Sequence, residues 1–122
     1  MQKANWRECR EYFVHGEAKE VCIVGPEEPE KNVCMEAPKL PCSTGMLFFN
    51  RAYLEPGRRL EIHRGMTEEL HYILEGTGIF TVNGEECEVS EGDTVYVPCG
   101  SEHGLFNPGP AELKYLVLGP SV

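Results

Sequence analysis

Turn residues divide the second half of the chain into short apolar segments, and this constrains its fold more than any other feature. From residue 45 onward, runs such as MLFFNRAYL, RRLEIHR, GIFTV and TVYVP alternate with segments that contain glycine or proline. Asn83-Gly84, between GIFTV and EECEVS, is typical of the two-residue turn of a β-hairpin. About eight such strands predict an all-β domain over residues 45–122, either a closed antiparallel barrel or a jelly roll (a double-stranded β-helix).

The first 44 residues lack this regular pattern. Two prolines in EAPKLPCSTG exclude a regular helix in that segment, and GPEEPEKN is typical of an acidic turn or loop. We expect residues 1–44 to form an extended N-terminal arm with one or two strands, such as EVCIV at 20–24. This arm would be part of the same fold or of a dimer contact.

Charge and hydropathy argue against several classes of protein. The net charge of −9 across 122 residues offers no basic surface to a nucleic-acid backbone, so we expect no nucleic-acid partner. Because no apolar stretch is long enough for a leader peptide or a membrane span, we expect a cytoplasmic protein without a membrane partner. The six widely spaced cysteines form no C-x-x-C pair and are expected to be mostly reduced thiols.

Three histidines and one carboxylate are candidate ligands of a metal ion. Side chains two apart share a strand face, so Glu69 and His71 point the same way. If residues 66–68 form a hairpin loop, His63 lies directly opposite His71, with Cβ atoms roughly 5 Å apart. His103 would approach from a later strand. Together they predict a site for one divalent transition metal, with iron, manganese, nickel, zinc and copper as alternatives.

Two segments of the chain resemble the motifs of the cupin superfamily. GDTVYVPCGSEHGLFN, residues 92–107, matches every fixed position of the second cupin motif, G-x5-P-x-G-x2-H-x3-N. Residues 57–76 are similar to the first motif, G-x5-H-x-H-x3-4-E-x6-G, but carry Gly65 in place of its second histidine. The resemblance is to small single-domain cupins and implies a β-barrel that holds one divalent metal, often within a dimer.

The resemblance also implies which residues hold the metal. The family's ligand positions correspond to His63, Glu69 and His103 in this chain. The strand pairing argued above suggests that His71 replaces the missing histidine, and Gly65 would then leave room for a substrate.

Further residues are candidates for contact with a substrate. Arg51 and Tyr53 share a strand face and, if that face points inward, would hold an anionic or hydroxylated molecule. If it points outward, the inner face carries Asn50 instead. Cys99 precedes His103 in the loop expected at the mouth of the barrel and is a further candidate, beside Gly65.

An apolar outer face suggests self-association. If the ligands point inward, the residues of opposite parity point outward: Leu60, Ile62, Leu70, Tyr72 and Leu74. Such a surface has to be covered, so we expect a homodimer to which the N-terminal arm contributes. A bulge near residue 60 would relieve the burial of the charged residues beside His63.

These features favour a metal-dependent enzyme acting on a small polar or anionic metabolite. Oxygenase, decarboxylase, isomerase and lyase activities remain alternatives, because the fold alone does not select a reaction. The alternative class of function is a non-catalytic cupin that binds or senses a sugar or another metabolite.

Overall fold

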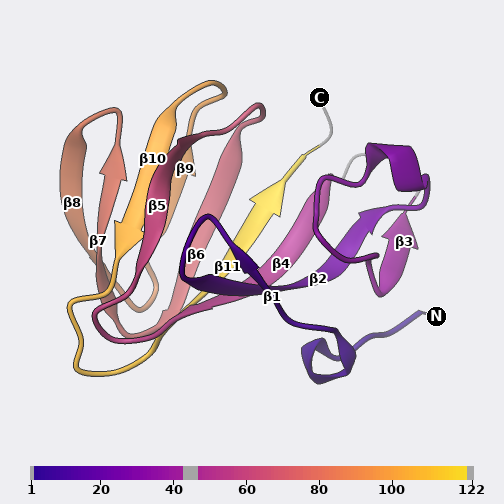
Figure 1. Ribbon diagram of the computed structural model, residues 1–122, viewed down its shortest axis with the longest axis horizontal. Helices are drawn as coiled ribbons and strands as arrows, with labels where there is room; N and C mark the ends of the chain where they lie inside the picture. The colour runs from indigo at the N-terminus through magenta and orange to yellow at the C-terminus, as the bar shows by residue number, and fades with distance from the viewer. Residues whose placement is uncertain (1, 43–46, 121–122) are drawn as a thin grey trace.

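The computed structural model describes residues 2–42 and 47–120, which form two β-sheets with no α-helix among them (Figure 1). The expected boundary between residues 44 and 45 lies outside the described residues. The elements of the first part are η1 (Trp6–Glu8), β1 (Tyr12–Val14), β2 (Ala18–Pro26), η2 (Pro29–Lys31) and β3 (Leu40–Cys42). The second part contains β4 (Phe48–Leu54), β5 (Arg59–Arg64), β6 (Glu69–Glu75), β7 (Thr77–Val82), β8 (Glu85–Ser90), β9 (Thr94–Val97), β10 (Glu102–Phe106) and β11 (Leu113–Gly119).

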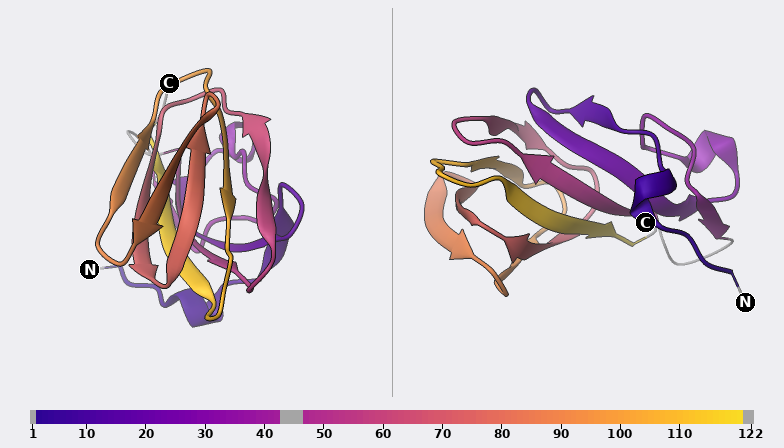
Figure 2. Two further views of the ribbon diagram at one scale, coloured as in Figure 1. Left: turned by 90° about the vertical axis from the view of Figure 1, so that its left-hand side faces the viewer. Right: turned by 90° about the horizontal axis from the view of Figure 1, so that it is seen from below.

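The two sheets have the strand order of a jelly roll. The larger sheet runs β1-β2-β4-β11-β6-β9, with β3 added in parallel to β2, and the smaller runs β5-β10-β7-β8. In Figure 2 the smaller sheet lies in front of the larger one when the molecule is seen from the side of β8. The eight strands β4–β11 confirm the predicted all-β barrel.

Alternating apolar residues build the core between the sheets. Along β11, the inward-facing Leu113, Tyr115 and Val117 are at most 3% exposed, while their neighbours are only partly buried. The Asn83-Gly84 turn joins β7 and β8 as expected, and both residues have positive φ, of 47° and 82°. This is the backbone geometry that a tight hairpin requires.

The residues before β4 extend the larger sheet. β2 pairs with β4 along five registered positions, and β1 pairs with β2. Within residues 2–42, an extended arm is therefore not evident: these strands are part of the same fold. In Figure 1, β3 and the end of β2 lie on the side of the molecule away from β7 and β8, whereas β1 lies nearer the middle.

The predicted hairpin between residues 59–64 and 69–75 is wrong. β5 pairs with β10 in the smaller sheet, whereas β6 pairs with β9 and β11 in the larger one. The chain crosses from one sheet to the other between them, as consecutive strands of a jelly roll can. His63 consequently lies opposite His103, not His71.

A bulge in β5 confirms the irregularity expected near residue 60. His103 pairs with His63 but Leu105 pairs with Leu60, so β5 holds one residue more than β10 across this interval. Gly104 fits here because a Cβ would stand 2.9 Å from both Leu60 O and Ile62 Cγ1. The bulge turns Leu60 inward to 4% exposure, which corrects its predicted outward position, while Ile62 is 61% exposed as expected.

None of the described residues forms a helix with the length and apolar character needed to cross a membrane.

Candidate metal centre

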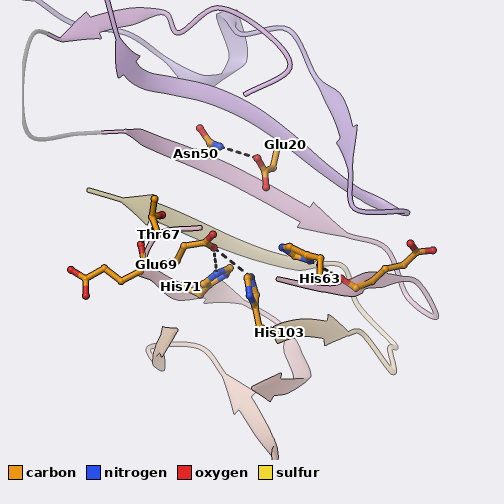
Figure 3. A network of polar contacts seen from close by, with 9 residues as sticks. Glu20, Asn50, His63, Thr67, Glu69, His71 and His103 are labelled. Atoms are coloured by element: carbon orange, nitrogen blue, oxygen red, sulfur yellow. Dashed lines mark hydrogen bonds and ion pairs between the residues drawn. The ribbon is translucent and has the colours of Figure 1, made fainter. Parts of the chain in front are cut away.

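Three of the predicted ligand residues meet between the two sheets. Glu69 and His71 come from β6 in the larger sheet, and His103 comes from β10 in the smaller sheet (Figure 3). Glu69 Oε1 lies 2.9 Å from His71 Nε2 and 3.5 Å from His103 Nε2. One ligand atom from each residue lies within 4.8 Å of the others. A carboxylate oxygen and two imidazole nitrogens at this spacing are able to surround one ion.

Burial and hydrogen bonding set the charge of this group. Burial would raise the pKa of Glu69, but the neighbouring His103 and the hydrogen bond from His71 outweigh it and hold the pKa below its usual range. Burial lowers the pKa of His71, only partly opposed by the hydrogen bond and charge of Glu69. At neutral pH the pair is therefore an ionised carboxylate beside a neutral imidazole, the protonation states that bind a metal.

Buried nitrogen atoms without partners show that the residues present fit a metal ion. Among the described residues, His71 Nδ1 and both ring nitrogens of His103 are buried without a hydrogen-bond partner. Buried polar groups are normally satisfied, so these orphaned atoms require an explanation. One divalent cation bound by a single nitrogen of each ring and by the Glu69 carboxylate would account for one of the two orphaned nitrogens of His103.

His63 lies next to this group but outside its tight cluster. Its ring is centred 4.3 Å from that of His103, and its Nδ1 stands 2.7 Å from the backbone oxygen of Glu61. Burial lowers the pKa of His63, although the backbone contact opposes this effect. A neutral His63 that donates from Nδ1 leaves Nε2 as an acceptor, which is the usual state of a metal-bound histidine.

His15 was not predicted to belong to the site. The sequence places it in no motif, yet its ring stacks on His63 with centroids 3.4 Å apart and planes inclined by 9°. Burial and the neighbouring His63 lower the pKa of His15 to about 4. All four histidines of the chain therefore lie in one cluster. The small number of histidines was the only signal in the sequence that His15 belongs to it.

The candidate metal centre is part of the wall of a cavity of about 320 Å³. His15, His63, Glu69, His71 and His103 all line it. Most of the remaining lining is apolar, and it includes Phe48, Leu60, Met66 and Val117. The volume suits a small molecule.

A second polar group lines the same cavity and was also missed. Glu20 on β2 accepts a hydrogen bond of 2.8 Å from Asn50 Nδ2 on β4. Tyr12 OH and Cys34 Sγ lie beside this pair. A charged residue at the start of the apolar run EVCIV was the signal available in the sequence.

The residues predicted to contact a substrate do not all lie at the cavity. Arg51 and Tyr53 lie on the outer face of β4, where Trp6 covers both, and neither is among the described residues that line the cavity. The inner face carries Asn50 instead. A Cβ at Gly65 would stand 3.4 Å from Glu69 Oε2, so Gly65 borders the metal centre. Cys99 is exposed, with its thiol 3.1 Å from the backbone oxygen of Met66.

Most of the cysteines are reduced thiols, as expected from the sequence. Cys9, Cys22, Cys34, Cys87 and Cys99 are present as free thiols.

Two facing sheets in jelly-roll order, with a histidine and glutamate cluster between them, define a small barrel of the cupin type. The chain belongs to this family: the family model described as the cupin domain matches residues 50–119. The predicted resemblance is thus confirmed.

Known relatives match only part of this chain. It is 34% identical over 71 residues to the oxalate-binding protein of Thermotoga maritima, covering 57% of this chain and 59% of that one. It is 38% identical over 60 residues to the dimethylsulfoniopropionate lyase DddW of Ruegeria pomeroyi, covering 49% and 39%. The matched segments thus span about half of the length of these relatives.

A solved structure resembles the fold over its full length. The crystal structure of a predicted oxalate decarboxylase from Thermotoga maritima superposes with a TM-score of 0.78, covering 99% of this chain and 100% of that one. At 22% sequence identity, this likeness shows the fold alone.

Proposed function

We propose that this cupin binds one divalent transition metal through Glu69, His71 and His103, with His63 as a further ligand. The observation that supports this most is the set of buried, unpartnered imidazole nitrogens beside an ionised carboxylate at a cavity wall. The two-histidine, one-carboxylate set suits iron, manganese, nickel, zinc or copper.

We further propose a metal-dependent enzyme that acts on a small polar or anionic molecule. Bound metal would supply Lewis-acid polarisation of a substrate oxygen. The chain itself would exclude water with its apolar lining and hold Glu69 ionised beside the substrate. The names of the two relatives, an oxalate-binding protein and a dimethylsulfoniopropionate lyase, both describe carboxylate-bearing molecules and support a carboxylate as the substrate class.

A non-catalytic binding module is the second candidate. The relative named for oxalate binding favours it, since that name describes binding without a reaction. The two candidates share the metal centre and differ only in turnover. Expression in the cytoplasm stays a prediction from the sequence under either one.

Elemental analysis tests the metal site. Protein purified without chelator or nickel resin should carry about one transition metal ion per chain, and His103→Ala should carry far less. Absence of metal, together with no uptake on titration, would falsify the proposal.

Turnover separates the two candidates. Metal-loaded protein should be incubated with oxalate or with dimethylsulfoniopropionate, and the products followed by proton and carbon NMR. Conversion that disappears in His103→Ala supports the enzyme. Binding of either compound without any conversion supports the binding module.

We also propose the homodimer expected from the sequence. The outer face of β6 and β9 exposes Leu70, Tyr72 and Tyr96 to 42%, 41% and 55%. Leu70 and Tyr96 are direct partners in the sheet, so these side chains form one patch. A second copy of the chain would cover it.

A further inference from the structure

The cavity has a second polar end opposite the metal centre. Glu20 and Asn50 come from β2 and β4, whereas the candidate ligands come from other strands: Glu69 and His71 from β6, His103 from β10 and His63 from β5. Figure 3 shows the Glu20–Asn50 pair on one side and the Glu69 group on the other. Because both groups line one cavity, a single small molecule is able to touch both.

One carboxyl oxygen of Glu20 is available to a ligand in the cavity. Its Oε1 accepts from Asn50 Nδ2 at 2.8 Å and from Tyr12 OH at 3.3 Å. Among the described residues, these are the hydrogen bonds that the Glu20 carboxyl accepts, and both are made to Oε1. In Figure 3 the second oxygen points toward the side of Glu69 and His63. This oxygen is an acceptor for a ligand that carries a donor.

The charges around the cavity favour a cation at this end. Glu20 and Glu69 bring two carboxyl groups to it, and no lysine or arginine occurs among the described lining residues. The thiol of Cys34 lies 3.5 Å from Asn50 Nδ2 and adds a further acceptor. A divalent metal ion would offset the charge of Glu69 and of one ligand carboxylate, which would leave the charge of Glu20 uncompensated.

The titration of Glu20 agrees with this arrangement. Burial raises the pKa of Glu20 to about 7, assisted by Cys34 and opposed by the hydrogen bonds from Asn50 and Tyr12. A ligand cation beside an acid that ionises near neutral pH would favour its charged form.

We propose that the ligand of this cavity is a short carboxylic acid with an ammonium group at its far end, bound there by Glu20. This proposal rests on the proposed metal site, which would hold the carboxylate because the described lining offers no basic side chain for it. The apolar residues between the two ends would contact the carbon chain. A dicarboxylate long enough to span both ends of the cavity is disfavoured, since its second carboxylate would face Glu20.

Matched acids test the proposal on zinc-loaded protein at pH 8, where Glu20 is mostly ionised. Zinc has no redox chemistry, so calorimetry reports binding alone. The pairs are 3-aminopropionate with butyrate, 4-aminobutyrate with pentanoate, and 5-aminopentanoate with hexanoate. At one length or more, the amino acid should bind at least about tenfold more tightly than its methyl-ended partner, as a charged hydrogen bond predicts.

Variants assign this preference to Glu20. Glu20→Gln should reduce the preference at least about fivefold while leaving zinc affinity unchanged. Glu88→Gln makes the same charge change at an exposed position of β8 and should alter neither quantity.

The two failures are distinguishable. If zinc does not bind, the proposed function fails. If zinc binds but no amino acid exceeds its methyl-ended partner at any length, the Glu20 proposal is overturned while the metal site stands. The wild-type ranking decides this even if Glu20→Gln does not fold.

Discussion

Individual histidines differ in how many of their nitrogens the protein satisfies. His63 Nδ1 contacts the backbone oxygen of Glu61. His71 Nε2 contacts the Glu69 carboxylate, whereas His71 Nδ1 is buried without a hydrogen-bond partner among the described residues. An unsatisfied buried group costs roughly 1–3 kcal/mol, so the protein bears this cost for a reason other than stability. Metal binding is the reason we propose.

His71→Ala tests the contribution of the residue that lies outside the family motif. Removing a direct ligand should weaken zinc affinity by more than about 100-fold, beyond the effect typical of residues that only orient a ligand. Competition with a chromogenic chelator measures this. His15→Ala removes an imidazole that stacks on His63 and should weaken affinity less than about tenfold. Equal effects of the two variants would contradict the assigned ligand set.

Glu20 should make stability depend on pH in the metal-free protein. Its pKa is raised from 4.5 to about 7, so the folded state favours the neutral acid. The resulting stability is complete below about pH 4.5 and is lost as the pH rises through about 7. Between these limits, wild type should lose up to about 3 kcal/mol relative to Glu20→Gln.

Urea unfolding at several pH values provides the measurement. Among the neighbours in the cavity, the pKa of Tyr12 is raised and that of Glu69 is lowered out of this pH range, whereas the hydrogen bond with Cys22 lowers the pKa of Cys34 to about 6. The difference between the curves therefore reports Glu20 together with its interaction with Cys34. A difference that does not change from pH 4.5 to pH 8 would show that Glu20 is not perturbed by burial.

At the scale of strands, the sequence predicted which segments form strands and how their side chains alternate, but it predicted less well which strands pair. The turn residues and the period of two identified β4 to β11, the inward side of Glu69 and His71, and the hairpin at Asn83-Gly84. The pairing of β5 with β6 was wrong because alternation is the same whether a strand faces its neighbour or the opposite sheet. Likewise, the face of Arg51 could not be chosen, since the Trp6 that covers it lies far away in sequence.

Asn107 shows how one residue of the family motif joins several elements. It is fully buried, and its Nδ2 donates to Leu54 O at 2.8 Å and to Ala111 O at 2.9 Å. Its Oδ1 accepts from Gly109 N at 2.8 Å. These bonds connect the end of β4 to the β10–β11 connection, so the role of Asn107 is structural.

Asn107→Ala should lower the free energy of unfolding by about 2–4 kcal/mol, because several buried groups lose their partner. Zinc affinity of the folded variant should stay within about threefold of wild type. Asn5→Ala, at the exposed cap of η1, should cost about 1 kcal/mol or less. Urea denaturation and chelator competition measure the two quantities, and a selective loss of zinc affinity would argue against a purely structural role.

At the scale of the whole molecule, the first strands complete the cavity as well as the sheet. β1 and β2 contribute Tyr12 and Glu20 to its lining, and the turn between them contributes His15. The sequence could not predict this, because these residues lie outside both cupin motifs and reach the site only through the pairing of β2 with β4. The cavity therefore depends on residues 2–42 as well as on the family domain.

The homodimer belongs to this scale as well. Light scattering after size-exclusion chromatography should give twice the 13.7 kDa mass of the chain. Leu70→Lys combined with Tyr72→Lys should give the monomer mass, since two charges would be buried at the interface. Phe13→Lys replaces a more exposed apolar residue on β1 and should leave the dimer intact. A wild-type monomer at micromolar concentration would refute the dimer.

The central claim is that Glu69, His71 and His103 surround one metal ion. Anomalous scattering from crystals of protein produced with a natural complement of metals, measured on both sides of the absorption edge, tests it most directly. The account predicts one peak within coordination distance, about 2.0–2.2 Å, of a nitrogen of His71, a nitrogen of His103 and an oxygen of Glu69. A peak bound without His71, or no peak in crystals soaked with zinc, would contradict it.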